Sequence, residues 1–269
     1  MRFTVIGAGG FIGAALAARL AAGGNEVFRP ARGSADIFTR PLGHVICAAG
    51  VTADFRERPF DTLRANAGLI AELLEKADFD TLVYLSSARI YRHAEHTGED
   101  AAIFLRPGDP EDLYDLTKLT GEALCHASRR PGVRIVRLTN VLGPDFRSKN
   151  FLFDLIRSAC DDGVIALRTA LQSEKDYVHL DDVLDLLPQI AVAGRQACYN
   201  VGAGRNLTHA DIVGAIVGRS GARVSVATNA PAMVLRPIDI TRLVDEFGYR
   251  PRSVVEYIPR LVDEYRKQT

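Results

Sequence analysis

The first half of the chain alternates short apolar runs, rich in β-branched residues, with longer segments whose apolar positions recur at helical spacing. Each run has the length of a buried strand, and each helical segment is long enough to connect two parallel strands. This alternation favours a parallel sheet with helices on both faces. We expect strands at Thr4–Ile6, Glu26–Phe28, His44–Ala48, Thr81–Leu85 and Val133–Leu138, and helices at Ile12–Ala22, Leu63–Lys76 and Leu113–Arg129.

After Gly143-Pro144 the predicted elements become smaller. The whole pattern is typical of an α/β fold, a Rossmann-type doubly wound parallel sheet with a small C-terminal lobe. We expect the core over residues 1–148 and the lobe mainly over 149–269, with some segments returning to the core, as one structural unit. Further helices are expected at Phe151–Cys160, from Asp181, at Ala210–Arg219 and at Val254–Lys267, and strands at Val164–Leu167, Tyr199–Val201 and Arg223–Ala227.

The composition excludes several classes of partner. Lysine plus arginine and aspartate plus glutamate number 33 each, so the chain lacks the basic excess that nucleic-acid or anionic-membrane binding usually leaves. No apolar stretch approaches the roughly 18 residues of a membrane span. The four cysteines are scattered without metal-ligand spacing, which favours a reduced, cytoplasmic setting and no metal. Because a strand-like run begins at Arg2, we expect a soluble protein without a signal peptide.

A glycine pattern follows the first predicted strand and opens the first predicted helix. Gly7 permits a tight turn, Gly10 allows the backbone to approach a pyrophosphate, and Gly13 allows close helix packing. The helix N-terminus offers unpaired N–H groups and positive potential to phosphates. An ordinary glycine-rich turn is the alternative, but the position between a strand and a helix is the one that dinucleotide binding requires.

Tyr114 and Lys118 lie four residues apart at the start of a predicted helix, so both side chains share one face. The reference pKa of tyrosine, near 10, is too high for ready proton exchange at neutral pH. A nearby ammonium can lower a phenol pKa by about one to three units, toward the range where general acid/base catalysis is efficient. The alternative is an exposed tyrosine beside an unrelated lysine.

Two serines, Ser86 and Ser87, end the strand that begins near Thr81. Ligands bind at the carboxyl ends of strands in open α/β sheets. A hydroxyl at this place is therefore a candidate partner for a substrate oxygen. Tyr91 follows four residues after Ser87, and Ser86 can instead cap or pack.

These motifs resemble the extended short-chain dehydrogenases, the NAD(P)-dependent epimerase/dehydratase family whose members act largely on nucleotide sugars. The glycine spacing resembles its GxxGxxG loop, the Ser87 segment its SS-x-x-VY, and Tyr114 with Lys118 its YxxxK. The resemblance covers nearly the whole chain in the right order. Further similar segments are residues 44–50, 64–67, 137–144, 175–183, 199–202 and 239–249.

The resemblance implies a separate catalytic role for each of three residues. Tyr114 exchanges the proton of a carbinol or carbonyl oxygen, Ser87 orients that oxygen, and Lys118 binds the nicotinamide ribose and tunes Tyr114. The cofactor carries the hydride. The other cofactor contacts implied by the resemblance are Gly7, Gly10, Phe11, Ile12 and Gly13 in the loop, Asp36 and Ile37 near the adenine, Ala48, Ala49 and Gly50 after the third strand, Asn66, and Leu85.

The end of the second strand indicates which nicotinamide cofactor is used. NAD enzymes usually carry an acid there, which accepts hydrogen bonds from the ribose 2′-OH. The resemblance places Ala31 at that position, between Arg29 and Arg32. Arginines can bind a 2′-phosphate through a planar, always-charged fork, so we favour NADP over NAD. The alternative is two solvated surface arginines.

Three activities remain open. Relatives that dehydrate carry Thr-Asp-Glu where this chain has Ser87-Ala88-Arg89, so dehydration lacks its proton carriers. We favour an NADPH-dependent ketoreductase acting on a nucleotide-linked keto-sugar or a similar polar carbonyl compound. An NAD-dependent nucleotide-sugar epimerase is the alternative enzyme, and a non-catalytic NADP(H)-binding sensor or scaffold is the alternative outside enzymes.

The substrate contacts are expected partly in the lobe. Asn140 and Asn150 can bond either a diphosphate or backbone, and Lys175 stands where many relatives carry arginine, which differs at a bidentate phosphate site. Many relatives form homodimers through helices corresponding to Leu63–Lys76 and Leu113–Arg129, so we expect a homodimer. The candidate substrate-binding residues are Ser87, Arg89, Asn140, Asn150, Lys175 and Arg236.

Overall fold

A computed structural model describes residues 1–52, 54–146 and 150–268, which divide into two units. The first unit comprises Met1–Leu138, Asp181–Val201 and Ile240–Tyr249. The second comprises Thr139–Leu180, Gly202–Asp239 and Arg250–Thr269. Among the described residues, no helix is both long and apolar enough to cross a bilayer.

The first unit is built on a six-stranded parallel sheet, which confirms the predicted Rossmann-type fold. The central strands are mostly apolar and largely buried because helices cover both faces of the sheet, as a parallel sheet requires. The strand order is β2-β1-β3-β4-β5-β9, with β1 (Arg2–Ile6), β2 (Glu26–Phe28), β3 (His44–Cys47), β4 (Thr81–Ser87), β5 (Val133–Leu138) and β9 (Cys198–Val201).

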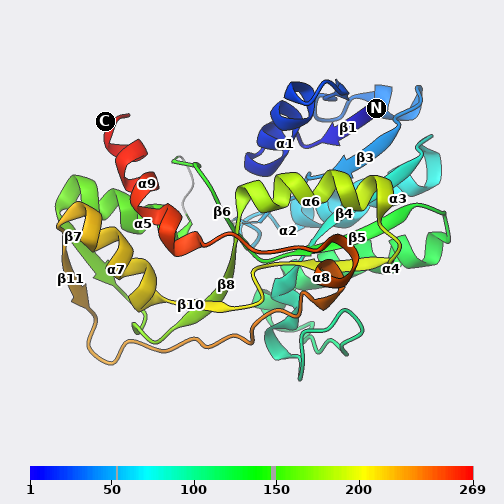
Figure 1. Cartoon of the computed structure of the whole chain (residues 1–269). Helices are drawn as coiled ribbons and strands as arrows, with labels where there is room; N and C mark the ends of the chain where they lie inside the picture. The colour runs from blue at the N-terminus through cyan, green and yellow to red at the C-terminus, as the bar shows by residue number, and fades with distance from the viewer. Residues whose placement is uncertain (53, 147–149, 269) are drawn as a thin grey trace. The chain divides into compact units, whose positions relative to one another are not determined.

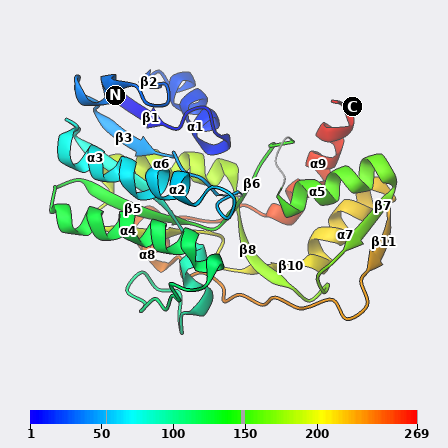
Figure 2. The same cartoon turned by 180° about the vertical axis from the view of Figure 1, so that it is seen from behind.

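Helices α1 (Phe11–Ala22) and α6 (Leu180–Ala193) lie on one face of this sheet. They are joined by ion pairs from Arg19 to Asp181 and Asp185. The other face carries α2 (Pro59–Leu63), α3 (Leu69–Lys76) and α4 (Leu113–Ser128), seen in front of the sheet in Figure 2 and behind it in Figure 1. A short helix, α8 (Thr241–Phe247), packs beside β9.

The predicted helix Leu63–Lys76 is longer and less regular than the pattern suggested. It begins with α2 at Pro59, a residue suited to the first helical turn, and continues through a π-helical segment, η2 (Arg64–Gly68), into α3. Three 3₁₀ turns lie at loops of the same unit: η1 (Ala35–Phe38), η3 (Ala88–His93) and η4 (Pro110–Asp112).

The second unit packs three helices against small sheets around its own apolar core. Its helices are α5 (Phe151–Arg157), extended by a π-helical segment η5 (Ser158–Asp162), α7 (His209–Ser220) and α9 (Val254–Arg266). The predicted β7 (Val164–Leu167) and β11 (Arg223–Val226) pair in parallel. A second sheet, which the sequence pattern did not predict as strands, has the order β10-β8-β6, with β6 (Asn140–Leu142), β8 (Glu174–His179) and β10 (Asn206–Thr208).

Candidate active site

The structure brings Ser87 and Tyr114 into contact. Ser87 is the last residue of β4, and Tyr114 lies in the first turn of α4, which packs on that strand. The Ser87 hydroxyl lies close enough to the Tyr114 phenol to lower the phenol pKa by hydrogen bonding. The Tyr114 ring is buried and packs against Phe55, with 5.7 Å between ring centroids. A phenol held in this way has a fixed direction and little access to water.

Lys118 lies one turn further along α4 and is also buried. Its ammonium donates a hydrogen bond to the backbone oxygen of Leu85 at 2.9 Å and lies 5.9 Å from the centroid of the Tyr114 ring. Burial lowers the pKa of Lys118 to about 8. The three residues predicted to carry catalysis therefore converge at the carboxyl end of β4.

The predicted lowering of the tyrosine pKa is wrong for this structure. Burial raises the pKa of Tyr114 to about 12, although the hydrogen bond from Ser87 lowers it. The reason is that Tyr114 loses water more completely than the sequence could show, while the Lys118 ammonium is directed to Leu85 rather than to the phenol oxygen. Tyr114 is thus held as a protonated phenol, the state that can donate a proton.

The glycine loop leaves room for a ligand and none for side chains. Gly7 has φ +86°, and a Cβ there would lie 2.6 Å from the Ala49 nitrogen. A Cβ on Gly13 would lie 2.3 Å from the Gly7 oxygen. Gly10, by contrast, is exposed and caps α1 without a side chain, so the first amides of the helix face open space. This donor set fits the pyrophosphate of a dinucleotide.

A second opening adjoins the catalytic group at Gly50. A Cβ there would lie 3.0 Å from Asn66 Oδ1 and 3.3 Å from Lys118 Nζ. Asn66 is fully buried, accepts a hydrogen bond from the Val51 nitrogen at 3.3 Å and donates one to Thr117 at 3.0 Å. Asn66 therefore holds the loop after β3 in place, and Gly50 keeps it open beside Lys118.

The remaining predicted cofactor residues lie at the start of α1, after β3, in β4 and in η1. Phe11 and Ile12 are half-buried at the start of α1, and Ala48 and Ala49 are half-buried after β3. Leu85 supplies the oxygen that receives Lys118. In η1, the Asp36 side chain is exposed, whereas Ile37 is buried in the core of the sheet.

Arginine side chains gather near the end of β2. Arg29 and Arg32 are exposed, as a residue that binds a 2′-phosphate at the surface must be. A third, Arg40, lies over the Phe28 ring with its guanidinium carbon 4.3 Å from the centroid. The sequence pattern missed Arg40, because only the fold of the chain through η1 brings it back to β2.

Ser86 faces away from Ser87, as adjacent strand residues do. Its hydroxyl donates to the buried carboxylate of Glu122. Arg137 also binds this carboxylate, with its Nη2 2.6 Å from Oε2, and donates a further hydrogen bond to Tyr91 at 2.6 Å. Ser86 is therefore part of a buried polar network, and Ser87 is the serine that faces the site.

The substrate-binding candidates of the second unit have the following surroundings. Asn140 donates to the Asp176 backbone oxygen at 2.9 Å, and Asn150 caps α5 by accepting from the Phe153 nitrogen at 3.1 Å. These contacts match the backbone-binding alternative for both asparagines. Lys175 lies in β8 opposite Leu207, and Arg236 is exposed before Pro237.

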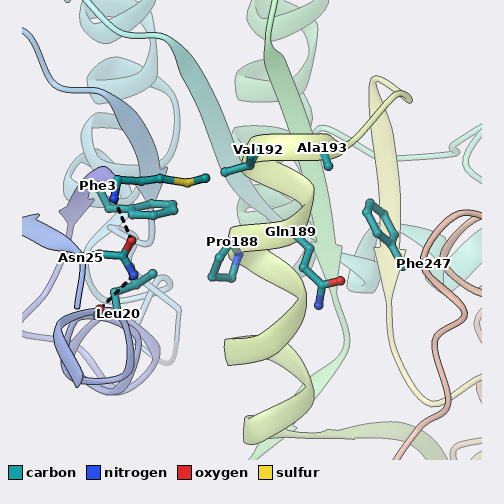
Figure 3. Close-up of a pocket in the computed structure, with 9 residues that line it drawn as sticks. Phe3, Leu20, Asn25, Pro188, Gln189, Val192, Ala193 and Phe247 are labelled. Atoms are coloured by element: carbon teal, nitrogen blue, oxygen red, sulfur yellow. Dashed lines mark hydrogen bonds between the residues drawn. The ribbon is translucent and has the colours of Figure 1, made fainter. Parts of the chain in front are cut away.

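A groove of about 350 Å³ lies elsewhere in the first unit (Figure 3). It is lined mainly by apolar side chains, including Phe3, Leu20, Pro188, Val192 and Phe247. Phe3 stands near the amino end of β1, whereas the glycine loop follows its carboxyl end, roughly 10–15 Å along the strand. The groove is therefore not part of the catalytic group.

Comparisons with known proteins identify the family of the chain. The model of the NAD dependent epimerase/dehydratase family matches residues 3–202. A dTDP-glucose 4,6-dehydratase from Streptomyces griseus is 26% identical over 179 residues, which are 64% of this chain and 54% of the relative. The chain thus spans about half the length of that relative. A dTDP-6-deoxy-L-talose 4-dehydrogenase (NAD(P)(+)) from Kitasatospora kifunensis is 27% identical over 298 residues, covering 94% of this chain and 92% of the relative.

Among solved structures, MoeE5 in complex with UDP-glucose and NAD superposes with a TM-score of 0.82. The match covers 100% of this chain and 99% of that chain at 22% sequence identity, so it supports the fold. The family match extends over most of the chain and includes the glycine loop, Ser87, Tyr114 and Lys118. The chain therefore belongs to the NAD-dependent epimerase/dehydratase family and is an oxidoreductase of the extended short-chain dehydrogenase type.

Proposed function

We propose that the protein is an NADPH-dependent ketoreductase that reduces the keto group of a nucleotide-linked keto-sugar or a similar polar carbonyl compound. The observation that carries this proposal is the convergence of Ser87, Tyr114 and buried Lys118 at the carboxyl end of β4. The 4-dehydrogenase relative, which matches over nearly its whole length, supports carbonyl reduction at a nucleotide sugar.

Bound NADPH supplies the hydride that reaches the carbonyl carbon. Ser87 donates a hydrogen bond to the carbonyl oxygen and orients it toward Tyr114. As negative charge develops on that oxygen, Tyr114 transfers its proton to it, giving the alcohol. The Lys118 ammonium, 5.9 Å from the centroid of the Tyr114 ring, adds positive potential near the resulting phenolate, which regains a proton once the product leaves and water enters the site. A phenol with a raised pKa starts this sequence in the protonated state.

The residues after Ser87 argue against dehydration. Elimination of water from a sugar needs one group that removes a proton and another that donates one. Ala88 has no titratable group, and the Arg89 guanidinium stays charged at all working pH values. Reduction of a carbonyl group does not need a titratable residue at position 88 or 89, because Tyr114 supplies the proton.

We propose that the first unit binds the dinucleotide and that Lys175 and Arg236 of the second unit contact the substrate, whereas Asn140 and Asn150, which the sequence also offered as candidates, hold backbone groups of the second unit. We also propose a homodimer through the α2, α3 and α4 surface. Phe60 and Leu63, three residues apart on α2, are 73% and 48% exposed, and together they form an apolar patch that a dimer would cover.

The cofactor preference is the first measurement. Titration with NADPH and NADH, followed by nicotinamide fluorescence, is expected to show tighter NADPH binding. In an Arg32→Ala variant the dissociation constant for NADPH should rise about tenfold, since one charge-assisted hydrogen bond to phosphate is lost, while NADH binding stays the same. Arg64→Ala is the matched control, because Arg64 is an exposed arginine of the same unit that pairs with Asp61. A preference for NADH, or NAD that copurifies and resists dialysis, would instead favour the epimerase.

The two serines are expected to separate catalysis from stability. Ser87→Ala should lower kcat/KM by about 10²-fold, because one donor to the developing oxyanion is lost. Ser86→Ala should leave kcat/KM nearly unchanged and lower the free energy of unfolding by about 1–3 kcal/mol, since Glu122 loses a hydrogen bond. Initial rates and urea denaturation of both variants measure this. Equal losses of activity in the two variants would contradict the assignment of Ser87.

A further inference from the structure

Arg89 lies beside the catalytic tyrosine in a tightly defined position. It follows Ser87 in η3, and its Nη2 donates a hydrogen bond to the Glu111 backbone oxygen at 2.9 Å and approaches Glu111 Oε2 at 3.3 Å. The guanidinium carbon lies 5.1 Å from the centroid of the Phe55 ring and 5.7 Å from that of Tyr114. Arg89 thus places a permanent positive charge within the cation–π range of Tyr114.

Asp115, the residue after Tyr114, opposes this charge from α4. Its carboxylate is fully buried and lies 3.6 Å from Arg89 Nε. Within the described residues, neither of its oxygens takes part in a hydrogen bond. Burial raises the pKa of Asp115 to about 6, and the Arg89 charge limits the rise. A buried carboxyl without hydrogen bonds is costly, so the structure keeps it charged chiefly through Arg89.

We propose that Arg89 is a positioning residue of the catalytic group, and that the Arg89–Asp115 ion pair sets the charge that acts on Tyr114. This role rests on the proposed function because it assumes that Tyr114 transfers the proton. The ion pair and its effect on the Tyr114 phenol do not depend on which substrate the enzyme uses. Arg89 gives the site a second cation, in addition to Lys118, near the group that must carry negative charge, and Asp115 offsets that charge.

The charges that face Tyr114 come from three elements. Arg89 of η3 favours the phenolate, and Asp115 of α4 disfavours it. Ser87 of β4 favours it through a hydrogen bond. Lys118, also of α4, is directed to Leu85. Behind Arg89, Glu111 is held by Arg56, so its carboxylate is shared between two guanidinium groups and neutralises Arg89 only in part.

Removing one member of the pair at a time should therefore move the Tyr114 ionisation in opposite directions. With Arg89→Gln the buried Asp115 charge is left opposite the phenol, and the midpoint should rise. With Asp115→Asn the Arg89 charge is no longer balanced, and the midpoint should fall. Each change is expected to be about one pH unit, the lower end of what a close charge produces.

The test uses the full chain with 3,5-difluorotyrosine at position 114. Its phenol is more acidic than that of tyrosine, so ¹⁹F NMR can follow the titration while the protein stays folded. Arg89→Lys keeps the charge, and its midpoint should lie closer to that of the parent than the Arg89→Gln midpoint does. Arg64→Gln is the matched control, since Arg64 is an exposed arginine of the same unit that pairs with Asp61 rather than with Glu111. Its midpoint should stay within about 0.3 pH units of the parent, because exposed charges are screened.

Unchanged midpoints in Arg89→Gln and Asp115→Asn, shifts of both midpoints in the same direction, or an equal shift in Arg64→Gln would each overturn the proposal. The same variants in the unlabelled enzyme should move the pH profile of kcat in the same two directions. Because the titration needs no substrate, a failure to find a reducible ketone would count against the proposed function alone. The NMR midpoints would still decide the role of Arg89.

Discussion

Replacing Tyr114 with phenylalanine is expected to lower kcat for carbonyl reduction by about 10²- to 10⁴-fold, the usual contribution of a general acid. Phenylalanine keeps the packing against Phe55 but has no proton to transfer to the substrate oxygen. Lys118 stays hydrogen-bonded to Leu85, so the cofactor pocket keeps its shape. Pre-steady-state measurement of NADPH oxidation with a saturating ketone would separate the chemical step from binding.

Three controls make this result specific. The dissociation constant for NADPH should change by less than about threefold, since the glycine loop and Gly50 do not involve the Tyr114 hydroxyl. The free energy of unfolding should fall by no more than about 1 kcal/mol, the net value of one hydrogen bond. Tyr84→Phe serves as the matched variant, because Tyr84 is a buried phenol of the same unit that donates to the Asn66 backbone oxygen at 2.7 Å. If Tyr114→Phe keeps more than a tenth of the parental kcat, another group supplies the proton.

The sheet of the first unit could be predicted from sequence because its central strands are largely buried on both faces. These strands are rich in apolar, β-branched residues, and all six strands that the pattern predicted for this sheet are confirmed, including the short and partly exposed edge strand β2. The strands of the small second sheet could not be found in this way. β8 contains Lys175 and Asp176, and Asp176 is buried because it accepts a hydrogen bond from the Ala203 nitrogen, 27 residues away. A local pattern carries no information about such a partner.

In the candidate site too, features local to one element could be predicted from sequence, whereas contacts between elements could not. The Tyr114/Lys118 spacing is local to one helix, and Ser87 marks the end of one strand, so sequence placed them together and the structure shows them in contact. The approach of Arg89 to Asp115 depends on how η3 and α4 pack, and that of Arg40 to Phe28 depends on η1. The predicted direction of the Tyr114 pKa shift was wrong for a related reason. The burial that raises this pKa is a property of the packed fold and not of the local sequence.

The buried network behind the site is held by one carboxylate. Glu122 of α4 receives Ser86, and its two oxygens bind the Arg137 guanidinium at 2.6–3.2 Å. The side chains of Glu122 and Arg137 are only 3% and 7% exposed, so water cannot replace either partner. Arg137 in turn donates to Tyr91, which donates to Asn200 at 2.9 Å. The network joins α4, the helix of Tyr114 and Lys118, to β4, β5, η3 and β9.

Glu122→Ala is expected to lower the free energy of unfolding by about 3–5 kcal/mol, because it leaves the Arg137 charge buried without a partner. Urea denaturation followed by circular dichroism measures the loss. The control is Glu26→Ala, which breaks the Arg2–Glu26 pair across β1 and β2; both side chains are about half exposed, so the cost should stay below about 1 kcal/mol. The double variant Glu122→Leu/Arg137→Met should unfold less readily than Glu122→Ala, since an apolar pair removes the stranded charge. If the double variant is instead less stable than Glu122→Ala, the stabilisation comes from the ion pair itself. The account based on an uncompensated charge is then wrong.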